Sequence, residues 1–419
     1  MMRIAYALAW LVALPLVLAR LAWRSRRQPG YLDRLGERFG RYGPALPGPY
    51  IWIHAVSVGE TRAAAPIVDA LKERHPRHHI LVTHMTPTGR ATSREIFGDR
   101  VERAWLPYDL GFAARRFLEN YRPELGIILE TEIWPRLLEE AARMDIPVVL
   151  ANARLSERSA RRYAWVPSLT RWSFANLKGV AAQTEADARR FASIGARDPV
   201  VLGNVKFDLA VPAGMIERGA QFRARFGTAR PVWVAGSTRE GEEALLVDAL
   251  VAQAAPADAL LVIVPRHPQR FDDVVRLVES RGLAVARRSG DAAVPADVRV
   301  VVGDSMGEMF AYYAAGDVVI MGGSLLDFGS QNLIEACALG RPVIVGPHTF
   351  NFSEASRSAI AAGAAMRVGD AREAIAAAAA LSADATRREE MGAKGREFVA
   401  AHRGAVQRLM DWIETKAAR

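Results

Sequence analysis

The sequence predicts an α/β protein built from two consecutive doubly wound domains, and three observations support this. First, 419 residues exceed what one ordinary core uses. Second, from residue 50 onward short runs rich in β-branched residues alternate with longer helical patterns, which is typical of a parallel sheet covered by helices. Third, this alternation starts again after a polar stretch near residue 204. Because open α/β sheets bind ligands at the carboxyl ends of their strands, we expect a ligand cleft between the two domains.

The predicted strands set the limits of these domains. In the first half the apolar runs cover residues 50–55, 79–83, 101–105, 125–129, 148–151, 180–183 and 200–202. In the second half they cover residues 232–235, 260–264, 284–286, 298–302, 318–321 and 343–345. We therefore expect a first domain over residues 28–208 and a second over 209–419. The second ends in Ala-rich amphipathic helices at 370–381 and 387–412, which either pack on the domains or return across the junction.

Residues 1–27 are predicted to form an uncleaved membrane anchor. An uncharged apolar run covers residues 4–19, and Arg3 precedes it. Four arginines follow it, namely Arg20, Arg24, Arg26 and Arg27. A secretory signal would carry its positive charge before the apolar run, whereas an excess after the run keeps the following domains in the cytoplasm. Because such a run spans only ~24 Å as a helix, against ~30 Å of hydrocarbon, a helix lying in the membrane interface or against the protein also remains possible.

Charge and cysteine content exclude several classes of protein. The excess of 55 Lys and Arg over 46 Asp and Glu gives a net charge of +9, which suits an anionic partner such as a phosphate or an acidic leaflet. The arginines are scattered and no nucleic-acid module interleaves them with aromatic residues, so we expect no nucleic-acid partner. The single cysteine, Cys337, excludes an internal disulfide, and its apolar neighbours predict a core residue.

The first candidate site follows the strand at 50–55. Ser57, Gly59, Glu60 and Arg62 stand in a tight turn that leads into a helix at the ligand edge of the sheet. Ser followed three residues later by Glu is also the capping-box pattern, and spacing alone favours that structural role. A serine nucleophile at Ser57 is disfavoured, because the usual turn needs Gly where Ala55 stands.

A second group of polar residues follows the next strands of the first domain. Glu130 and Glu132 come after the strand at 125–129, where they could accept sugar hydroxyls, transfer protons or bind metal. Metal is the weakest of these options, since no Asp or His cluster lies nearby in the sequence. Arg154 follows the strand at 148–151 and can hold an anion through two hydrogen bonds.

In the second domain, small or glycine-containing turns follow four predicted strands. They contain Ser237, then Arg266 and His267, then Met306, Gly307 and Glu308, and then Gly323 and Ser324. Such turns suit a nucleotide whose phosphate meets backbone N–H groups at helix starts. Asn332 and Glu335 belong to the next helix start, where Glu335 could accept ribose hydroxyls or act as an ordinary first-turn Glu. No Walker loop and no complete Gly-x-Gly-x-x-Gly is present, which argues against ATP hydrolysis and NAD chemistry.

These motifs, taken in order, resemble those of bacterial 3-deoxy-D-manno-octulosonic acid (Kdo) transferases, which have the two-domain GT-B fold. The matching segments are residues 52–60, 130–135, 152–156, 203–208, 265–268, 303–309 and 322–335. One departure is Ser330, where a second Gly is more usual.

The resemblance implies an inverting, metal-independent transfer of Kdo from CMP-Kdo to a lipid A precursor at the inner membrane, without a cofactor. It implies that Glu60 is the general base and that Glu132 lies near the acceptor or the base. The implied substrate-binding residues are Ser57, Gly59, Arg62, Glu130, Arg154, Lys206, Ser237, Arg266, His267, Met306, Gly307, Glu308, Gly323, Ser324, Asn332 and Glu335. Two alternatives remain open: a GT-B transferase that uses a UDP-sugar on a lipid, and a membrane-tethered lipid-binding or nucleotide-binding protein.

Overall fold

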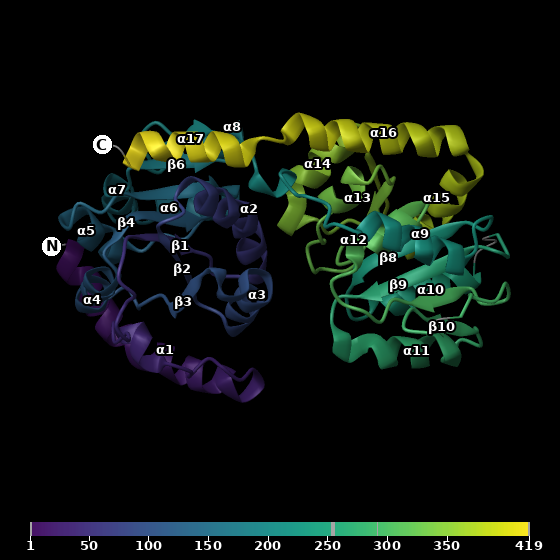
Figure 1. Ribbon diagram of the computed structural model, residues 1–419, viewed down its shortest axis with the longest axis horizontal. Helices are drawn as coiled ribbons and strands as arrows, with labels where there is room; N and C mark the ends of the chain where they lie inside the picture. Colours follow the sequence, from purple (N-terminus) through teal and green to yellow (C-terminus); the bar gives the residue numbers. More distant parts are fainter. Residues whose placement is uncertain (1, 253–255, 291, 418–419) are drawn as a thin grey trace. The chain divides into compact units, whose positions relative to one another are not determined.

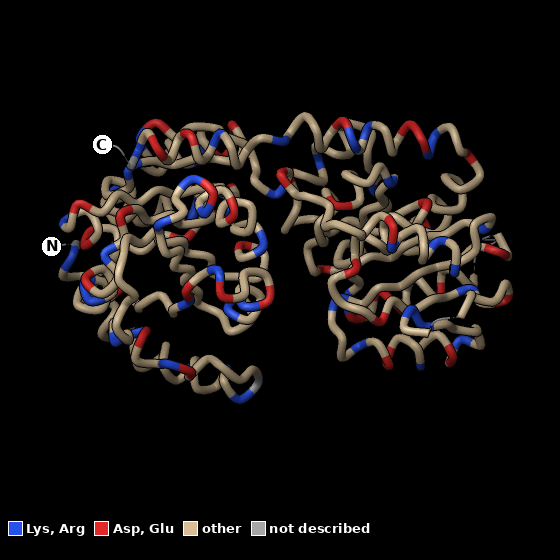
Figure 2. The backbone as a smooth tube through the Cα atoms, in the orientation of Figure 1, with Lys and Arg blue, Asp and Glu red and all other residues tan. Residues whose placement is uncertain are grey.

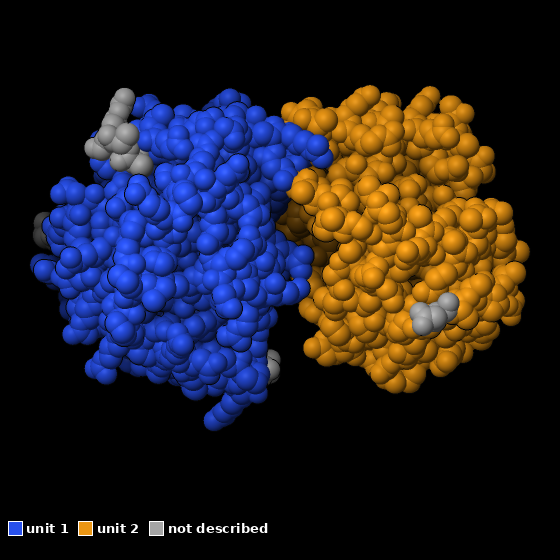
Figure 3. Space-filling view, in the orientation of Figure 1, with its two compact units in different colours: residues 1–208, 403–419 blue, residues 209–402 orange. Residues whose placement is uncertain are grey.

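The computed structural model describes residues 2–252, 256–290 and 292–417, and the chain divides into two compact units (Figure 3). Unit 1 contains Met1–Asp208 and Arg403–Arg419, and unit 2 contains Leu209–His402. The boundary after residue 208 is where the sequence predicts it. The end of the chain was predicted to belong to the second domain, but its last helix belongs to unit 1. Figure 2 shows basic and acidic residues interspersed over both units.

Unit 1 contains a seven-stranded parallel sheet in the order β3-β2-β1-β4-β5-β6-β7 (Figure 1). Its strands are β1 (Tyr50–His54), β2 (His79–His84), β3 (Glu102–Trp105), β4 (Pro123–Leu129), β5 (Val148–Ala153), β6 (Gly179–Ala182) and β7 (Val200–Val201). Its helices are α1 (Met2–Arg27), α2 (Val58–Arg74), α3 (Pro87–Phe97), α4 (Gly111–Tyr121), α5 (Pro135–Arg143), α6 (Glu157–Ala164), α7 (Pro167–Ala175), α8 (Glu185–Ser193) and α17 (Ala405–Ala417), with short 3₁₀ turns η1 (Leu35–Phe39), η2 (Gly98–Arg100) and η3 (Val205–Phe207).

Unit 2 contains a second seven-stranded parallel sheet, in the order β10-β11-β9-β8-β12-β13-β14. Its strands are β8 (Val232–Thr238), β9 (Leu260–Pro265), β10 (Val285–Arg287), β11 (Val300–Val302), β12 (Val318–Met321), β13 (Val343–Val345) and β14 (Ala365–Arg367). Its helices are α9 (Met215–Phe226), α10 (Glu242–Ala252), α11 (Phe271–Ser280), α12 (Met309–Ala315), α13 (Ile334–Ala338), α14 (Ser353–Ala361), α15 (Ala371–Ala383) and α16 (Ala385–His402), with 3₁₀ turns η4 (Pro268–Arg270) and η5 (Phe350–Phe352). The pair of doubly wound sheets confirms the predicted fold class.

The strands of unit 1 are apolar at successive positions because helices cover both faces of the sheet. In β1, Ile51 and Ile53 pack into a core with α2 and α17. Tyr50 and Trp52, which point the other way, pack into a core with α4 and α5. Unit 2 has its own core, built around the buried strands β8, β9, β11 and β12.

The helix α17 packs in unit 1 because its inner face is apolar. Leu409, Met410 and Ile413 are buried in the core that α2 also joins. The carboxylate of Asp208 accepts hydrogen bonds from the N–H groups of Gly404 and Val406 at the start of this helix. Gly404 has a φ of 84°, a left-handed conformation that ends α16. The prediction of one long helix over 387–412 is therefore wrong, because α16 and α17 are separate helices in different units.

Candidate active site

Each sheet has one point where the strand order reverses direction, and open α/β sheets bind ligands there. In unit 1 this point lies between β1 and β4, which are parallel neighbours. In unit 2 it lies between β8 and β12. Most of the predicted site residues follow the carboxyl ends of these strands.

Glu60 lies in the first turn of α2, directly after β1. Ser57 caps this helix, and its Oγ accepts a hydrogen bond from the N–H of Glu60 at 3.3 Å. In return, the carboxylate of Glu60 accepts the N–H of Val56 at 2.7 Å and the hydroxyl of Ser57 at 2.9 Å. The capping interpretation is therefore confirmed, and the two bonds hold the carboxylate in one orientation.

Capping does not exhaust the chemistry of Glu60, since its side chain is only half-buried. Its partial burial, followed by the negative charge of Glu130, raises the pKa of Glu60 to about 7, and Glu132 adds to the effect. The two carboxylates after β4 thus both disfavour the charged form of Glu60, which follows β1. A carboxylate with a pKa near 7 is suited to accept a proton at neutral pH.

Glu130 and Glu132 have different surroundings. Glu130 follows β4 with a φ of 60°, an uncommon conformation that is costly for a residue other than Gly. Its carboxylate forms an ion pair with Nζ of Lys206 at 2.8 Å, and Lys206 comes from η3. Glu132 lies two residues further on, and burial raises its pKa. The structure therefore joins Lys206, predicted only through the resemblance, to the carboxylate cluster.

The charge of Glu130 gives a first prediction, read from the pH dependence of kcat/KM. Glu130→Gln removes a negative charge, so the pKa of Glu60 falls and the rise of kcat/KM with pH, its acid limb, moves to lower pH. Lys206→Met removes the positive partner of Glu130, so the acid limb moves to higher pH. The two variants are matched, and shifts in the same direction would contradict this coupling.

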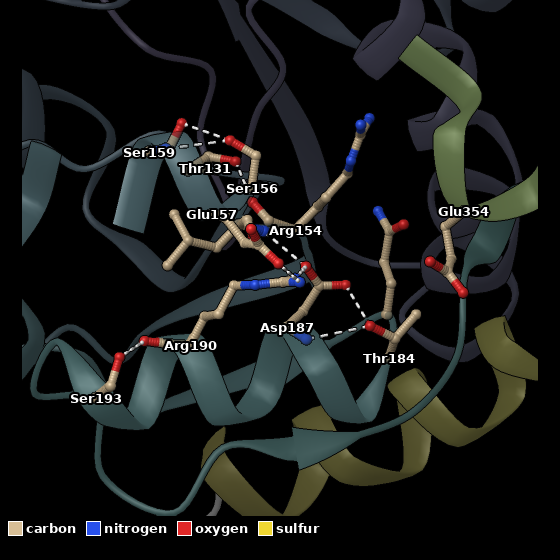
Figure 4. A network of polar contacts seen from close by, with 12 residues as sticks. Thr131, Arg154, Ser156, Glu157, Ser159, Thr184, Asp187, Arg190, Ser193 and Glu354 are labelled. Atoms are coloured by element: carbon tan, nitrogen blue, oxygen red, sulfur yellow. Dashed lines mark hydrogen bonds and ion pairs between the residues drawn. The ribbon is translucent and has the colours of Figure 1, made fainter. Parts of the chain in front are cut away.

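Arg154 lies on a loop after β5 that other side chains hold in place (Figure 4). Its carbonyl accepts the hydroxyl of Thr131, beside Glu130. The next residue, Leu155, donates its N–H to the buried carboxylate of Asp187 at 2.9 Å, and its carbonyl accepts Arg190 at 3.1 Å. Figure 4 shows the side chain of Arg154 extending away from Asp187 and Arg190. Asp187 is thus a support of the loop that the sequence reasoning missed.

Two buried histidines, His54 and His84, lie behind the turn that leads to Glu60, and the sequence reasoning missed both. Burial lowers the pKa of His54 to about 3 and that of His84 to about 4, so both rings are neutral at neutral pH. Nδ1 of His84 lies 2.8 Å from the carbonyl oxygen of Ala55, at the start of the turn. No sequence signal separates such a supporting histidine from one in the core.

Gly59 and Arg62 are both exposed at the start of α2. A Cβ on Gly59 would meet only Oγ of Ser57, at 3.8 Å. The space beside Glu60 is therefore open on this side.

In unit 2, the glycine-rich loop after β12 is held by a buried carboxylate that the sequence reasoning missed. Glu242, the first residue of α10, is fully buried. It accepts the N–H groups of Gly323 at 2.6 Å, Arg239 at 2.8 Å and Leu325 at 2.9 Å. The ends of β8 and β12 are thereby fixed to the same side chain.

The backbone around this loop is tightly packed. Ser237 has a φ of 57°, and Gly322 packs directly on its carbonyl group. Ser324 is fully buried; its hydroxyl donates to the carbonyl of Met321 and accepts the N–H of Gly346 at 2.8 Å. The structure therefore uses the hydroxyl of Ser324 to support the loop.

This packing predicts different effects of two Gly→Ala substitutions on the free energy of unfolding. In Gly322→Ala the new Cβ would collide with the backbone carbonyl of Ser237, which cannot move aside. We expect a loss of about 1–3 kcal/mol in the free energy of unfolding. In Gly59→Ala the Cβ has room, and we expect little change in stability. Thermal unfolding followed by circular dichroism compares the two, and equal losses would contradict the prediction.

Positive side chains gather at the carboxyl ends of β8 and β9. Burial, and then the charges of Arg239, Arg266 and Arg270, lower the pKa of His267. The backbone N–H of Arg266 donates to the carbonyl of Thr238 at 2.9 Å, which joins the two strand ends. Arg239 also stacks over the ring of Phe328, 4.7 Å from its centroid. The group of Arg239, Arg266, His267 and Arg270, of which the sequence reasoning identified two members, is suited to hold an anion.

The remaining predicted residues of unit 2 are divided between exposed and internal positions. Met306 and Gly307 are exposed in the loop after β11, whereas Glu308 is buried. Glu308 forms ion pairs with Arg218 at 2.5 Å and Arg288 at 2.7 Å, so its charge is compensated within unit 2.

Asn332 and Glu335 lie together at the start of α13. The amide of Asn332 donates to Glu335 at 3.0 Å, and its oxygen accepts the N–H of Ile334 at 3.2 Å. The helix begins at Ile334, so Glu335 lies in its first turn. Ser330 has a φ of 70°, a conformation that Gly adopts more readily, which agrees with the usual Gly at this position. Over the described ranges, no group of three or more His, Cys, Asp or Glu could hold a metal ion.

Comparison with solved structures identifies the fold. A glycosyltransferase from Rickettsia africae superposes with a TM-score of 0.60 over 88% of this chain and 99% of that chain, at 12% sequence identity. Two doubly wound units with polar clusters at their strand ends are the architecture of the GT-B fold.

Sequence comparison identifies the family. A family model described as 3-Deoxy-D-manno-octulosonic-acid transferase (kdotransferase) matches residues 33–209. The 3-deoxy-D-manno-octulosonic acid transferase of Bordetella pertussis is 44% identical over 98% of both chains. The protein of the same name from Haemophilus influenzae is 37% identical over 99% of this chain and 98% of its own length. The chain belongs to the Kdo transferase family, and as a member it is a glycosyltransferase enzyme of lipopolysaccharide biosynthesis.

Proposed function

We propose that this chain transfers Kdo from CMP-Kdo to a lipid A precursor, with inversion at the anomeric carbon, without a metal ion, and with Glu60 as the general base. The observation that carries the proposal is Glu60 itself: a half-buried carboxylate at the ligand edge of unit 1, with its pKa raised to about 7. The 44% identical relative bears the name of this transferase.

The proposed step balances as a single displacement. Glu60 removes the proton from a hydroxyl of the acceptor, and the oxygen forms a bond to the anomeric carbon of Kdo. The bond from that carbon to the phosphate oxygen breaks, and CMP leaves with the electron pair. Attack from the face opposite the leaving group inverts the anomeric configuration.

The leaving phosphate gains negative charge in this step, and stabilising such charge lowers the barrier. The positive charges of Arg239, Arg266 and Arg270 at the strand ends of unit 2 supply this stabilisation. The backbone N–H groups of the glycine-rich loop are held by Glu242, so this loop presents a fixed surface to the donor.

We also propose that the protein is attached to the inner membrane through α1, with both units in the cytoplasm. An 18-residue window within the segment Arg3–Arg26 has a mean hydropathy of 2.0, and the helix is long and apolar enough to cross a membrane. Arginines follow its apolar run, which favours retention of the units on the cytoplasmic side.

The decisive test gives purified full-length protein both substrates and measures product mass. We expect Kdo transfer and CMP release from CMP-Kdo and lipid A precursor, at an unchanged rate in EDTA. Transfer from UDP-sugars alone would replace the donor assignment with the first alternative. Binding of either substrate without turnover would favour the tethered binding protein.

A further inference from the structure

In the described part of the chain, the helix α1 packs on the rest of unit 1 along one face, through residues spaced at intervals of three and four. Trp10, Leu14, Val17 and Leu18 pack on a buried cluster formed by Tyr108, Leu110 and Ala113. The ring of Trp10 lies 5.8 Å from that of Tyr108. Leu21, further along the same face, is buried. This stripe continues over most of the helix, and Figure 1 shows α1 (purple) running along the outside of unit 1.

The first turns of α1 are fixed to the same unit by polar contacts. Arg3 forms an ion pair at 2.5 Å with Glu139, a buried residue of α5. The hydroxyl of Tyr6 donates to the buried carboxylate of Asp109 at 2.7 Å. Asp109 in turn accepts the N–H groups of Arg136 and Leu137 and so caps the start of α5.

These contacts are incompatible with a helix that crosses a bilayer. The 26 residues of α1 extend ~39 Å, so in a spanning helix its first turns would lie beyond the ~30 Å hydrocarbon core, far from a cytoplasmic unit. Arg3 and Tyr6 instead contact unit 1, as does Leu18 near the other end. Both ends of α1 therefore lie on the same side of the membrane as unit 1.

The opposite face of α1 is exposed and apolar. Val12 is 76% exposed and Leu16 is 72% exposed, and the same face carries Ile4, Leu8 and Leu11. A surface helix in water normally carries polar residues on its outer face. An exposed apolar patch of this kind marks a surface that another molecule or a membrane covers.

The charges beside this face indicate what covers it. Arg20, Arg24 and Arg26 follow the apolar run directly, and Trp23, a residue type enriched at membrane interfaces, is 52% exposed among them. Arginine and tryptophan suit the headgroup layer of an anionic leaflet, and the net charge of +9 adds to this attraction. A second copy of the chain would carry the same positive charge.

From this arrangement we infer that α1 does not span the membrane. It lies in the membrane plane, docked on unit 1 through its inner stripe, with its outer face in the acyl region of one anionic leaflet. This inference rests on the proposed function only for the attachment of the protein to the membrane. It replaces the predicted spanning anchor by the interfacial helix that the sequence left open.

The side on which the first turn lies can be measured without any activity assay. Cys337 is the only cysteine, so a Cys337→Ser background accepts single new ones. Arg3→Cys is treated with a membrane-impermeant maleimide in spheroplasts and in inside-out vesicles, beside Glu73→Cys as the control on exposed unit 1 surface. We expect both cysteines to be labelled only in inside-out vesicles. Labelling of Arg3→Cys in spheroplasts would show a spanning helix and overturn the inference.

A second experiment identifies what covers the outer face. Full-length protein is floated with vesicles of phosphatidylglycerol and phosphatidylethanolamine, and the double variant Val12→Glu with Leu16→Glu is compared with the exposed-charge control Glu73→Gln. We expect the double variant to bind at least about tenfold less, since two charges enter the acyl region. Equal flotation of all three proteins would refute the lipid contact. It would also be refuted if the unmodified protein did not bind vesicles but formed a dimer, and the double variant were monomeric.

Discussion

Replacing Glu60 by glutamine should lower kcat by about 10²–10⁴-fold, because the amide cannot accept the proton of the attacking hydroxyl. The change is nearly isosteric, so the amide oxygen can still accept the hydrogen bond from the N–H of Val56 and the turn should keep its shape. We therefore expect CMP to bind to unit 2 with little change. Single-turnover rates and calorimetric CMP binding measure the two quantities separately.

The pH dependence gives an independent readout for Glu60. Its pKa is raised to about 7, and the base works only when deprotonated, so kcat/KM should rise with pH and level off above that value. The matched control is Glu73→Gln, at an exposed position in the last turn of the same helix, which should leave the profile unchanged. Near-normal turnover of Glu60→Gln would remove Glu60 from the role of base.

Glu242→Ala should have the largest effect on unit 2. The substitution leaves three backbone N–H groups without their acceptor in a buried place, at about 1–3 kcal/mol for each unsatisfied group. We expect a clear drop in the thermal midpoint of unit 2. A loosened loop at the ends of β8 and β12 should also raise the KM for CMP-Kdo more than it lowers kcat.

The neighbouring Glu240 provides the control for this substitution. It is exposed, and its ion pair with Arg270 is long, at 3.8 Å, so Glu240→Ala should change stability by less than about 0.5 kcal/mol. Limited proteolysis along a temperature ramp reports each unit separately, which a single melting curve would not. A Glu242→Ala protein as stable as the control would show that other groups hold the loop.

The sheets could be predicted well because their signal is local. Both faces of each sheet are covered, so most strands stand out as continuous apolar runs. β14 was missed because Ala365, Met366 and Arg367 contain no β-branched residue. The assignment of α17 to unit 1 was missed for a different reason: it depends on contacts with Asp208 and α2, which no helical periodicity contains.

The site could be predicted in part, because parallel strands bring their carboxyl ends to one edge. That rule places Glu60 and Glu130 in one group, and the structure couples them. It does not distinguish side chains that face a ligand from those that support a loop. The hydroxyl of Ser324 forms hydrogen bonds with backbone groups of unit 2, and Glu242 has the same sequence pattern as any first-turn glutamate.

The position of α17 also has a consequence for biosynthesis. Unit 1 is translated almost completely before unit 2, yet Leu409, Met410 and Ile413 of its core leave the ribosome last. The domain that is made first is thus the last to be finished, and until then an apolar face beside α2 stays open. Premature termination anywhere in the second half of the message would leave the first half incomplete as well, a substrate for chaperones and proteases.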